Sequence, residues 1–121
     1  MAYHITLVTN KSNSSIAITN PAYEADSKLV ANGAAYVPKR PILVNKIPGN
    51  PSYADALTQA VNIYTSTDNY CFWDNTNSSV NGVGQKGGAI PAFNMSAGNL
   101  QITINPNGTL TFSQATSSAT A

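Results

Sequence analysis

Short runs in which apolar and polar residues alternate dominate the chain, a pattern typical of half-buried β-strands. The first run places Ile5, Leu7 and Thr9 on one side, and the next places Ile16 and Ile18 together. Turn-forming residues separate these two runs, so we expect a hairpin there. The other predicted strands cover residues 28–31, 42–47, 61–65, 69–74, 100–104 and 109–112.

Turn and helix signals divide the rest of the chain. Residues 105–108, Asn-Pro-Asn-Gly, predict a tight hairpin, because Asn and Gly tolerate positive φ. Residues 21–51 contain five of the seven prolines, which predicts edge strands and loops in that segment. One short helix is predicted over residues 51–60, with Asn50 as its N-cap and Pro51 in its first turn. Its apolar face would consist of Tyr53, Leu57 and Ala60. The glycine-rich residues 82–88 are predicted to form a loop.

About eight short strands separated by turns predict an all-β protein. The expected architecture is a two-layer antiparallel β-sandwich of the Greek-key type, with at most one short helix. A length of 121 residues fits one domain with one core. We therefore expect a single β-sandwich domain over residues 1–113 and a polar C-terminal tail over residues 114–121.

The composition is poor in charge, which changes the range of functions to consider. Charged residues make up 9 % of the chain, compared with roughly 25 % in ordinary domains. The polar surface must therefore come from 15 Asn, 12 Ser and 12 Thr residues. The net charge is +1 and Lys39-Arg40 is the only adjacent pair of cations, so the sequence does not predict a nucleic-acid partner. Uncharged polar surfaces are cheap to desolvate against each other, which favours a homo-oligomer.

The N-terminal residues and the apolar runs bear on localisation. No apolar run approaches the roughly 20 residues that a transmembrane helix needs. The first residues also lack the basic and apolar regions of a signal peptide. These features favour a cytoplasmic or non-classically secreted protein and leave the compartment unknown.

The residues that most enzymes use are sparse. His4 is the only histidine, no Gly-x-Ser-x-Gly motif accompanies it, and it is predicted to be an ordinary strand residue. Glu24 and Asp26 would share a strand face, but no aromatic platform lies beside them, so they are predicted to be solvated acids. Cys71, the only cysteine, is predicted to be a core residue rather than a reactive thiol. The sequence therefore predicts a non-catalytic protein without a cofactor or a bound metal.

One segment, residues 64–79, combines the sole tryptophan with tyrosines, acids, amides and hydroxyls. Aromatic faces beside carboxylates and amides suit sugars, and aromatics also suit the choline of a phospholipid headgroup. The candidate ligand-binding residues are Tyr64, Asp68, Tyr70, Trp73, Asp74 and Asn75. Alternation places Trp73 on the face opposite Tyr70, so the alternative that Trp73 is a core anchor stays open.

Within this segment, residues 74–79 match the Asx-Asx-x-x-Ser/Thr-Ser pattern of calcium-binding βγ-crystallins. Acid and amide oxygens suit this hard cation. The glycine-anchored aromatic motif that normally precedes the pattern is missing, so a calcium site is not predicted.

Several short motifs together resemble the aegerolysin family. They are Met1-Ala2-Tyr3, residues 10–15 followed by Ile16, Ile18 and Asn20, then Ile63-Tyr64, Phe72-Trp73-Asp74 and Gly87-Gly88-Ala89-Ile90. The resemblance implies a small β-sandwich that binds membrane lipids, in some members together with a pore-forming partner. This chain lacks the family's central Cys-Gly-Arg-Ser-Asp stretch, its many tryptophans and its acidic charge. It also extends about 30 residues beyond Gly87-Gly88-Ala89-Ile90.

The sequence thus leads to two hypotheses of different classes. The first is a non-catalytic recognition module that binds glycans or membrane lipid headgroups through residues near Trp73. The alternative is a self-assembling structural protein, such as a coat, filament or crystal-forming subunit.

Overall fold

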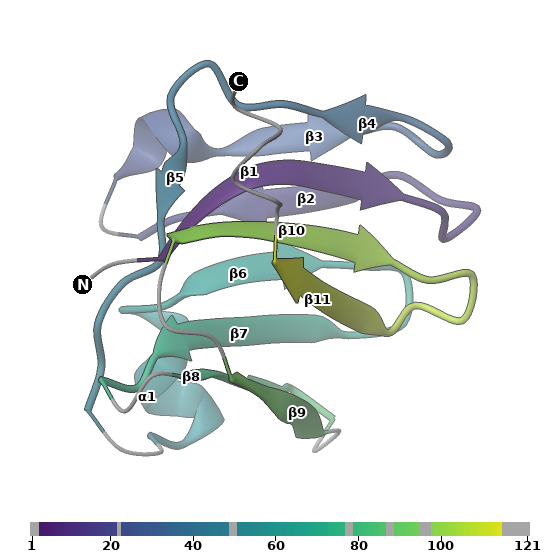
Figure 1. Ribbon diagram of the computed structural model, residues 1–121. Helices are drawn as coiled ribbons and strands as arrows, with labels where there is room; N and C mark the ends of the chain where they lie inside the picture. Colours follow the sequence, from purple (N-terminus) through teal and green to yellow (C-terminus); the bar gives the residue numbers. More distant parts are fainter. Residues whose placement is uncertain are drawn as a thin grey trace.

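Two β-sheets face each other in the computed structural model, which describes residues 3–21, 23–48, 51–76, 79–86, 89–94 and 98–114 (Figure 1). The five-stranded sheet contains β1 (Tyr3–Asn10), β4 (Ala35–Tyr36), β5 (Ile42–Leu43), β10 (Gly98–Ile104) and β11 (Leu110–Gln114). The six-stranded sheet contains β2 (Ile16–Thr19), β3 (Lys28–Val30), β6 (Val61–Tyr64), β7 (Asn69–Asp74), β8 (Ser79–Gly84) and β9 (Ala89–Asn94). The all-β prediction is confirmed, with one short α-helix.

The topology differs from the expected antiparallel sandwich at one strand pair. The order of strands is β11-β10-β1-β4 in one sheet, with β5 also beside β1, and β3-β2-β6-β7-β8-β9 in the other. β1 and β10 run parallel, whereas the other paired strands run antiparallel. A parallel pair needs a long crossover connection, which most of the chain supplies here. As a result, β1 and β10 begin at the same end of the sandwich.

The main core fills the space between the sheets. Fully buried side chains from both layers meet there, among them Ile5, Ile18, Ile63 and Ile102. Phe72 of β7 contacts Phe112 of β11 edge-on, with 5.3 Å between the ring centroids. Burial of these side chains is the main driving force for folding, and it reflects the alternating pattern in the sequence.

Ile5, Leu7 and Thr9 do not form the single buried stripe that was predicted, because β1 contains a β-bulge. The register with β10 shifts between Ile5 and Leu7, so Thr6 is an extra residue in the strand. Beyond the bulge the alternation reverses: Val8 is fully buried, while Leu7 and Thr9 are only partly buried. An extra residue in a strand turns every later side chain to the other face, which period-two alternation alone does not reveal.

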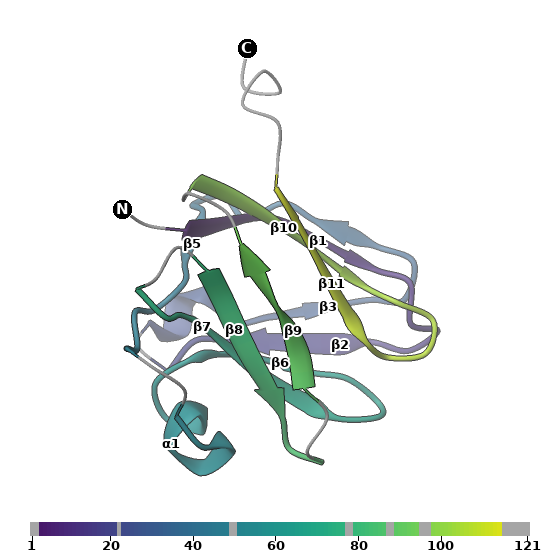
Figure 2. The same ribbon diagram turned by 60° about the horizontal axis from the view of Figure 1, so that its bottom comes forward.

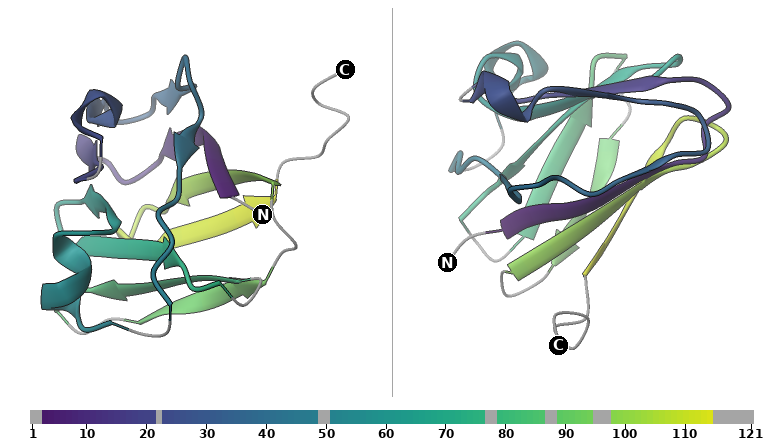
Figure 3. Two further views of the ribbon diagram at one scale, coloured as in Figure 1. Left: turned by 90° about the vertical axis from the view of Figure 1, so that its left-hand side faces the viewer. Right: turned by 90° about the horizontal axis from the view of Figure 1, so that it is seen from above.

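The predicted helix exists but is shorter than expected. α1 (Tyr53–Leu57) begins after Ser52, whose hydroxyl accepts a hydrogen bond from the backbone N–H of Asp55 at 3.3 Å. Ser52 therefore caps the helix, and the predicted cap, Asn50, lies outside the described residues. The helix lies on the outer face of the six-stranded sheet (Figures 2 and 3).

A second, smaller core lies between α1 and the outer face of β7. Its buried members are Ile47, Ala56, Ala60, Cys71 and Trp73, with Tyr53, Leu57 and Val83 packed against them. Because Phe72 faces the main core, β7 is buried on both faces, and all six of its residues are buried. This explains why the β7 sequence is nearly continuous in apolar and aromatic residues.

Two strands, β8 and β9, were not predicted from the sequence. β8 includes part of the segment predicted as a glycine-rich loop, and no strand was predicted in the region of β9. Gly82 and Gly84 pair with Phe72 and Tyr70 of β7, so glycines are part of the ladder. Glycine has low strand propensity, and here pairing with β7 outweighs it. Pro91 lies in β9, an edge strand, where a missing N–H is tolerated.

One of the two predicted hairpins is confirmed and the other is wrong. The turn between β1 and β2 does not close a hairpin, because the two strands lie in different sheets and the chain crosses from one sheet to the other there. Between β10 and β11, the N–H of Gly108 donates to Asn105 O at 2.8 Å and Gly108 has φ 86°. This confirms the Asn-Pro-Asn-Gly hairpin. β11 ends at Gln114, and the rest of the predicted tail lies outside the described residues.

Asn10, at the end of β1, joins the two sheets through its side chain. Its amide N–H group donates to Ser14 O at 2.7 Å and to Val30 O, in the opposite sheet, at 3.0 Å. Its amide oxygen accepts from the backbone N–H and the hydroxyl of Ser12, at 3.0 and 2.7 Å. The side chain is fully buried and fully bonded, which makes it the polar anchor of the turn between β1 and β2.

Candidate functional site

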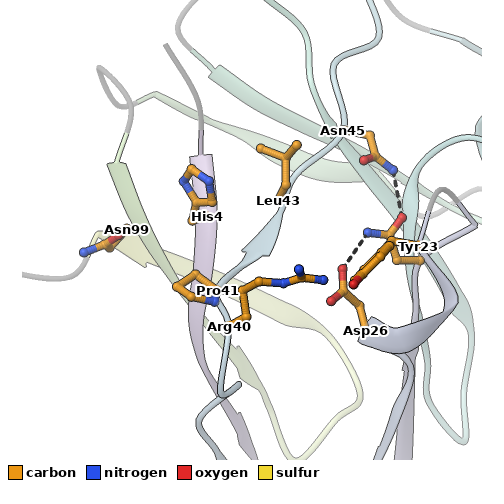
Figure 4. A pocket seen from close by; sticks show the side chains of 9 residues that line it. His4, Tyr23, Asp26, Arg40, Pro41, Leu43, Asn45 and Asn99 are labelled. Atoms are coloured by element: carbon orange, nitrogen blue, oxygen red, sulfur yellow. Dashed lines mark hydrogen bonds between the residues drawn. The ribbon is translucent and has the colours of Figure 1, made fainter.

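A pocket of about 620 Å³ lies at the end of the sandwich where β1 and β10 begin (Figure 4). Its lining comes from four separate parts of the chain: His4, Asn20, Tyr23, Asp26, Arg40, Pro41, Leu43, Asn45 and Asn99. A cavity of this size fits a small organic ligand such as a sugar ring or a headgroup.

One wall of the pocket is a row across three strands. His4 of β1 pairs with Asn99 of β10 on one side and with Leu43 of β5 on the other. The parallel pairing of β1 with β10 places Asn99 there, because it brings the beginnings of both strands to this end. His4 was predicted to be an ordinary strand residue, and the structure adds that it lines the pocket.

The opposite wall contains a chain of amide and carboxylate groups. The side-chain amide of buried Asn20 donates to Asp26 Oδ2 at 3.0 Å, and its oxygen accepts from Asn45 Nδ2 at 3.0 Å. Asn45 Nδ2 also donates to the carbonyl of Gln59 at 2.7 Å. Each amide therefore orients its neighbour, and the carboxylate of Asp26 is held at the pocket rather than left to rotate in solvent.

Tyr23 and Arg40 form the aromatic and cationic part of the lining. The guanidinium carbon of Arg40 lies 4.2 Å from the centroid of the Tyr23 ring, a cation–π contact. Figure 4 shows the guanidinium group pointing toward Tyr23 and Asp26. Tyr23 remains 44 % exposed, so part of its ring is available to a ligand.

Asp26 belongs to a different local structure from the one predicted. Glu24 and Asp26 were expected to share a strand face, but the residues Glu24–Asp26 form a short 3₁₀ helix, η1. The turn is closed by backbone bonds from Asp26 to Tyr23 and from Ser27 to Glu24, both 3.0 Å. This turn brings Tyr23 and Asp26 to the same pocket, so an aromatic residue does lie beside the acid.

The structure does not bring the six residues predicted from the sequence to one open surface. Trp73 is only 2 % exposed and lies beneath α1, so its ring is not open to stack on a sugar. Tyr70 faces the main core, and Tyr64 is 43 % exposed at the end of β6. Burial, and next the charge of Asp68, raise the pKa of the Tyr70 hydroxyl above its usual value.

The three polar members of the predicted site hold turns at opposite ends of β7. The carboxylate of Asp68 accepts hydrogen bonds from the backbone N–H groups of Asn69, at 2.8 Å, and Lys86, at 3.2 Å. Asp74 is buried and accepts from Thr76 N at 2.8 Å, while Asn75 Oδ1 accepts from the hydroxyl of Ser79 at 2.9 Å. These bonds are typical of structural turn residues.

Metal binding finds no support in the part of the chain that the structure describes. Those residues contain no group of three or more His, Cys, Asp or Glu side chains that could hold an ion. The calcium-like pattern of residues 74–79 includes two positions, 77 and 78, that lie outside the described residues.

Cys71 is a core residue, as predicted. It is fully buried, and its thiol donates to Asn62 Oδ1 at 2.8 Å. Burial, followed by the charge of Asp68, raises the pKa of this thiol from 9.0 to about 11. The neutral thiol is thus favoured in the folded protein, and the stability that it contributes is complete below pH 9.0 and is lost as the pH rises toward about 11.

We expect native Cys71 to react with a chromogenic disulfide at about pH 8 roughly 100-fold more slowly than the unfolded chain, or slower still. The raised pKa leaves little thiolate, and burial adds to the protection. Labelling with and without denaturant measures the ratio. Equal rates in the two states would contradict the buried position.

Comparison with known proteins assigns no family to this chain. No protein-family model matches it, and neither curated proteins nor solved structures give a significant match. None of the helices that the structure describes is long and apolar enough to cross a bilayer.

The pocket was missed in the sequence because its residues are scattered between positions 4 and 99. The adjacent cations Lys39-Arg40 are a local feature that could have drawn attention to it, but the sequence analysis used them only to argue against a nucleic-acid partner.

Proposed function

We propose that this protein is a non-catalytic recognition module that binds a glycan or a lipid headgroup in the pocket at the end of the sandwich. One observation carries the proposal: exposed Tyr23, in contact with Arg40, lines the same pocket as the carboxylate of Asp26. That carboxylate accepts a hydrogen bond from Asn20, which Asn45 holds in turn. The site therefore differs from the segment around Trp73 that the sequence suggested.

This arrangement suits a polyhydroxylated ligand. The exposed part of the Tyr23 ring offers an apolar surface to the carbon face of a sugar or inositol ring. Asp26 accepts hydrogen bonds from hydroxyl groups, and Arg40 donates them. Because Asn20 and Asn45 already order the carboxylate, binding costs less conformational entropy at this wall.

The placement of the histidine supports binding rather than catalysis. General acid–base chemistry requires groups that reach the same atom of a substrate. In Figure 4, His4 lies beside Leu43 on one wall, whereas Asp26 lies on the other. The resemblance of the sequence to aegerolysins supports lipid headgroups as one ligand class.

The test compares two tyrosines of equal exposure. Tyr23→Ala is expected to weaken binding to the best ligand on a glycan array or in vesicle flotation by about 10-fold or more, because a stacking aromatic is lost. Tyr64→Ala is the matched control, since Tyr64 is 43 % and Tyr23 44 % exposed. Tyr64→Ala is expected to bind like the unchanged protein, and circular dichroism checks that both variants fold.

The reverse result would place the binding site outside the pocket. Loss of binding in Tyr64→Ala with Tyr23→Ala unaffected would favour the residue 64–79 segment. A protein that binds neither glycans nor lipids would defeat both versions of the recognition hypothesis.

Self-association is the alternative function, and one observation favours it. β3 lies at the edge of the six-stranded sheet, and its Leu29 is 72 % exposed. An edge strand with an exposed apolar residue is a ready surface for pairing with another copy. Light scattering on the same samples distinguishes the two functions: an oligomer that binds no ligand would favour assembly.

A further inference from the structure

A second hollow of about 640 Å³ adjoins the pocket and is strongly basic. It is lined by Asp26, Lys28, Tyr36, Val37, Lys39 and Arg40, so it shares Asp26 and Arg40 with the first pocket. Three of the six cationic residues in the chain therefore gather here, in a protein whose net charge is only +1. Such a local concentration of charge attracts an anionic group.

We infer that the ligand is a polyhydroxylated ring that carries a phosphate, with the ring in the first pocket and the phosphate in the basic hollow. This inference rests on the proposed function, because it assigns a chemical class to the ligand of the same site. The shared residues make the two hollows one composite site, with one compartment for the neutral ring and a basic compartment for the anionic phosphate.

Arg40 connects the two compartments. Its guanidinium carbon lies 4.2 Å from the centroid of the Tyr23 ring, and the guanidinium group carries five N–H donors. Those N–H groups that Tyr23 leaves free to bind can donate in pairs to phosphate oxygens. Lys28, with its Nζ 5.7 Å from the centroid of the Tyr36 ring, and Lys39 supply further charge beside it.

Among the described residues that line either hollow, Asp26 is the one acid, and it sets the orientation of the ligand. Its Oδ2 accepts from Asn20, on the side of the first pocket. A phosphate next to this carboxylate would be repelled, whereas a hydroxyl group can donate to it. The ring hydroxyls therefore face Asp26, and the phosphate is directed toward the lysines.

The experiment uses the soluble headgroup glycerophosphoinositol, neutral myo-inositol and inorganic phosphate, each followed by NMR titration of the full chain. We expect glycerophosphoinositol to bind about 10-fold more tightly than either of the others, because only it fills both compartments. The double variant Lys28→Gln/Lys39→Gln should lose most of this advantage and leave the affinity for myo-inositol unchanged. Added salt should reduce the advantage as well.

Two controls separate charge from position and lipid from soluble ligand. Lys11→Gln/Lys86→Gln makes the same change of net charge at exposed lysines outside both hollows, and it should bind like the unchanged protein. Vesicles of phosphatidylcholine with phosphatidylinositol test the membrane-borne form of the ligand. Tighter binding to these vesicles than to the soluble headgroup would assign the lipid as the source, and equal binding would assign a soluble phosphate.

The outcomes distinguish this inference from the proposed function. Binding of myo-inositol that depends on Tyr23 but gains nothing from the phosphate would overturn the inference and leave the proposed function intact. Equal binding to vesicles of phosphatidylserine and of phosphatidylinositol, with no binding of the soluble headgroup, would also overturn it. Failure of every polyol, glycan and lipid vesicle to bind would overturn both.

Discussion

Replacing Trp73 with alanine is expected to lower the free energy of unfolding by about 3–5 kcal/mol. The indole is 2 % exposed and packs with Ala56, Ala60 and Cys71 between α1 and the sheet, so its removal leaves a cavity. Urea unfolding followed by far-UV circular dichroism measures the loss. The decrease is a large part of the total stability of a typical domain. Trp73→Phe is a milder variant with an expected loss of about 1–3 kcal/mol. It allows the contribution of Trp73 to be measured even where Trp73→Ala does not fold.

Tyr64→Ala is again the matched control, because it removes an aromatic side chain that is 43 % exposed. Its expected cost is less than about 1 kcal/mol. Equal losses for Trp73→Ala and Tyr64→Ala would contradict the buried position of Trp73. Trp73→Phe should also keep full ligand binding, since Trp73 lines neither hollow. A Trp73→Phe protein that folds but does not bind the ligand would indicate that residues 64–79 form the binding site.

Asn10→Ala is expected to cost about 3–5 kcal/mol, although it removes a polar side chain of moderate size. Four hydrogen bonds of the side chain would be lost, to partners in the turn and to Val30 O in the opposite sheet. The buried groups at Ser12 and Val30 would then lack these partners, and each such group costs about 1–3 kcal/mol. Chemical unfolding followed by the fluorescence of Trp73 measures the effect.

Two further variants show whether the effect comes from the bonds. Asn32→Ala removes an exposed amide whose oxygen accepts from Asn13 N at 3.1 Å, and it should cost less than about 1 kcal/mol. Asn10→Asp keeps the acceptor but turns the donor toward Ser14 O and Val30 O into a second acceptor, so it should destabilise the fold about as much as Asn10→Ala. A harmless Asn10→Asp would show that the two donated bonds contribute little.

Local chemistry in the sequence was enough to predict the fold class. Strands such as β6 and β7 begin and end within a residue of their predicted bounds, because alternation and turn residues act over a few positions. The same holds for the turn at Asn105–Gly108, where the residues themselves tolerate the required backbone angles. Burial of Cys71 also followed from its place in an apolar run.

Tertiary structure decided the features that depend on a neighbouring strand. Alternation does not show the extra residue at Thr6, which moves Leu7 out of the core, or the direction in which β10 runs beside β1. Nor does it show that glycines join a ladder, because β8 forms through its pairing with β7 rather than through its own propensity. The sequence left undecided whether Trp73 is buried, for the same reason: the helix that covers it, α1, comes from another part of the chain.

The candidate site depends most strongly on tertiary structure. Its wall of Leu43, His4 and Asn99 exists only because β1 pairs with β5 and β10 in this register. Tyr23 and Arg40 meet although loops and strands separate them in the sequence. The sequence by itself determined that this is a sandwich of short strands with little charge. Where its few charged and aromatic side chains gather was decided by long-range strand pairing, because residues far apart in the chain become neighbours only when the sheets form.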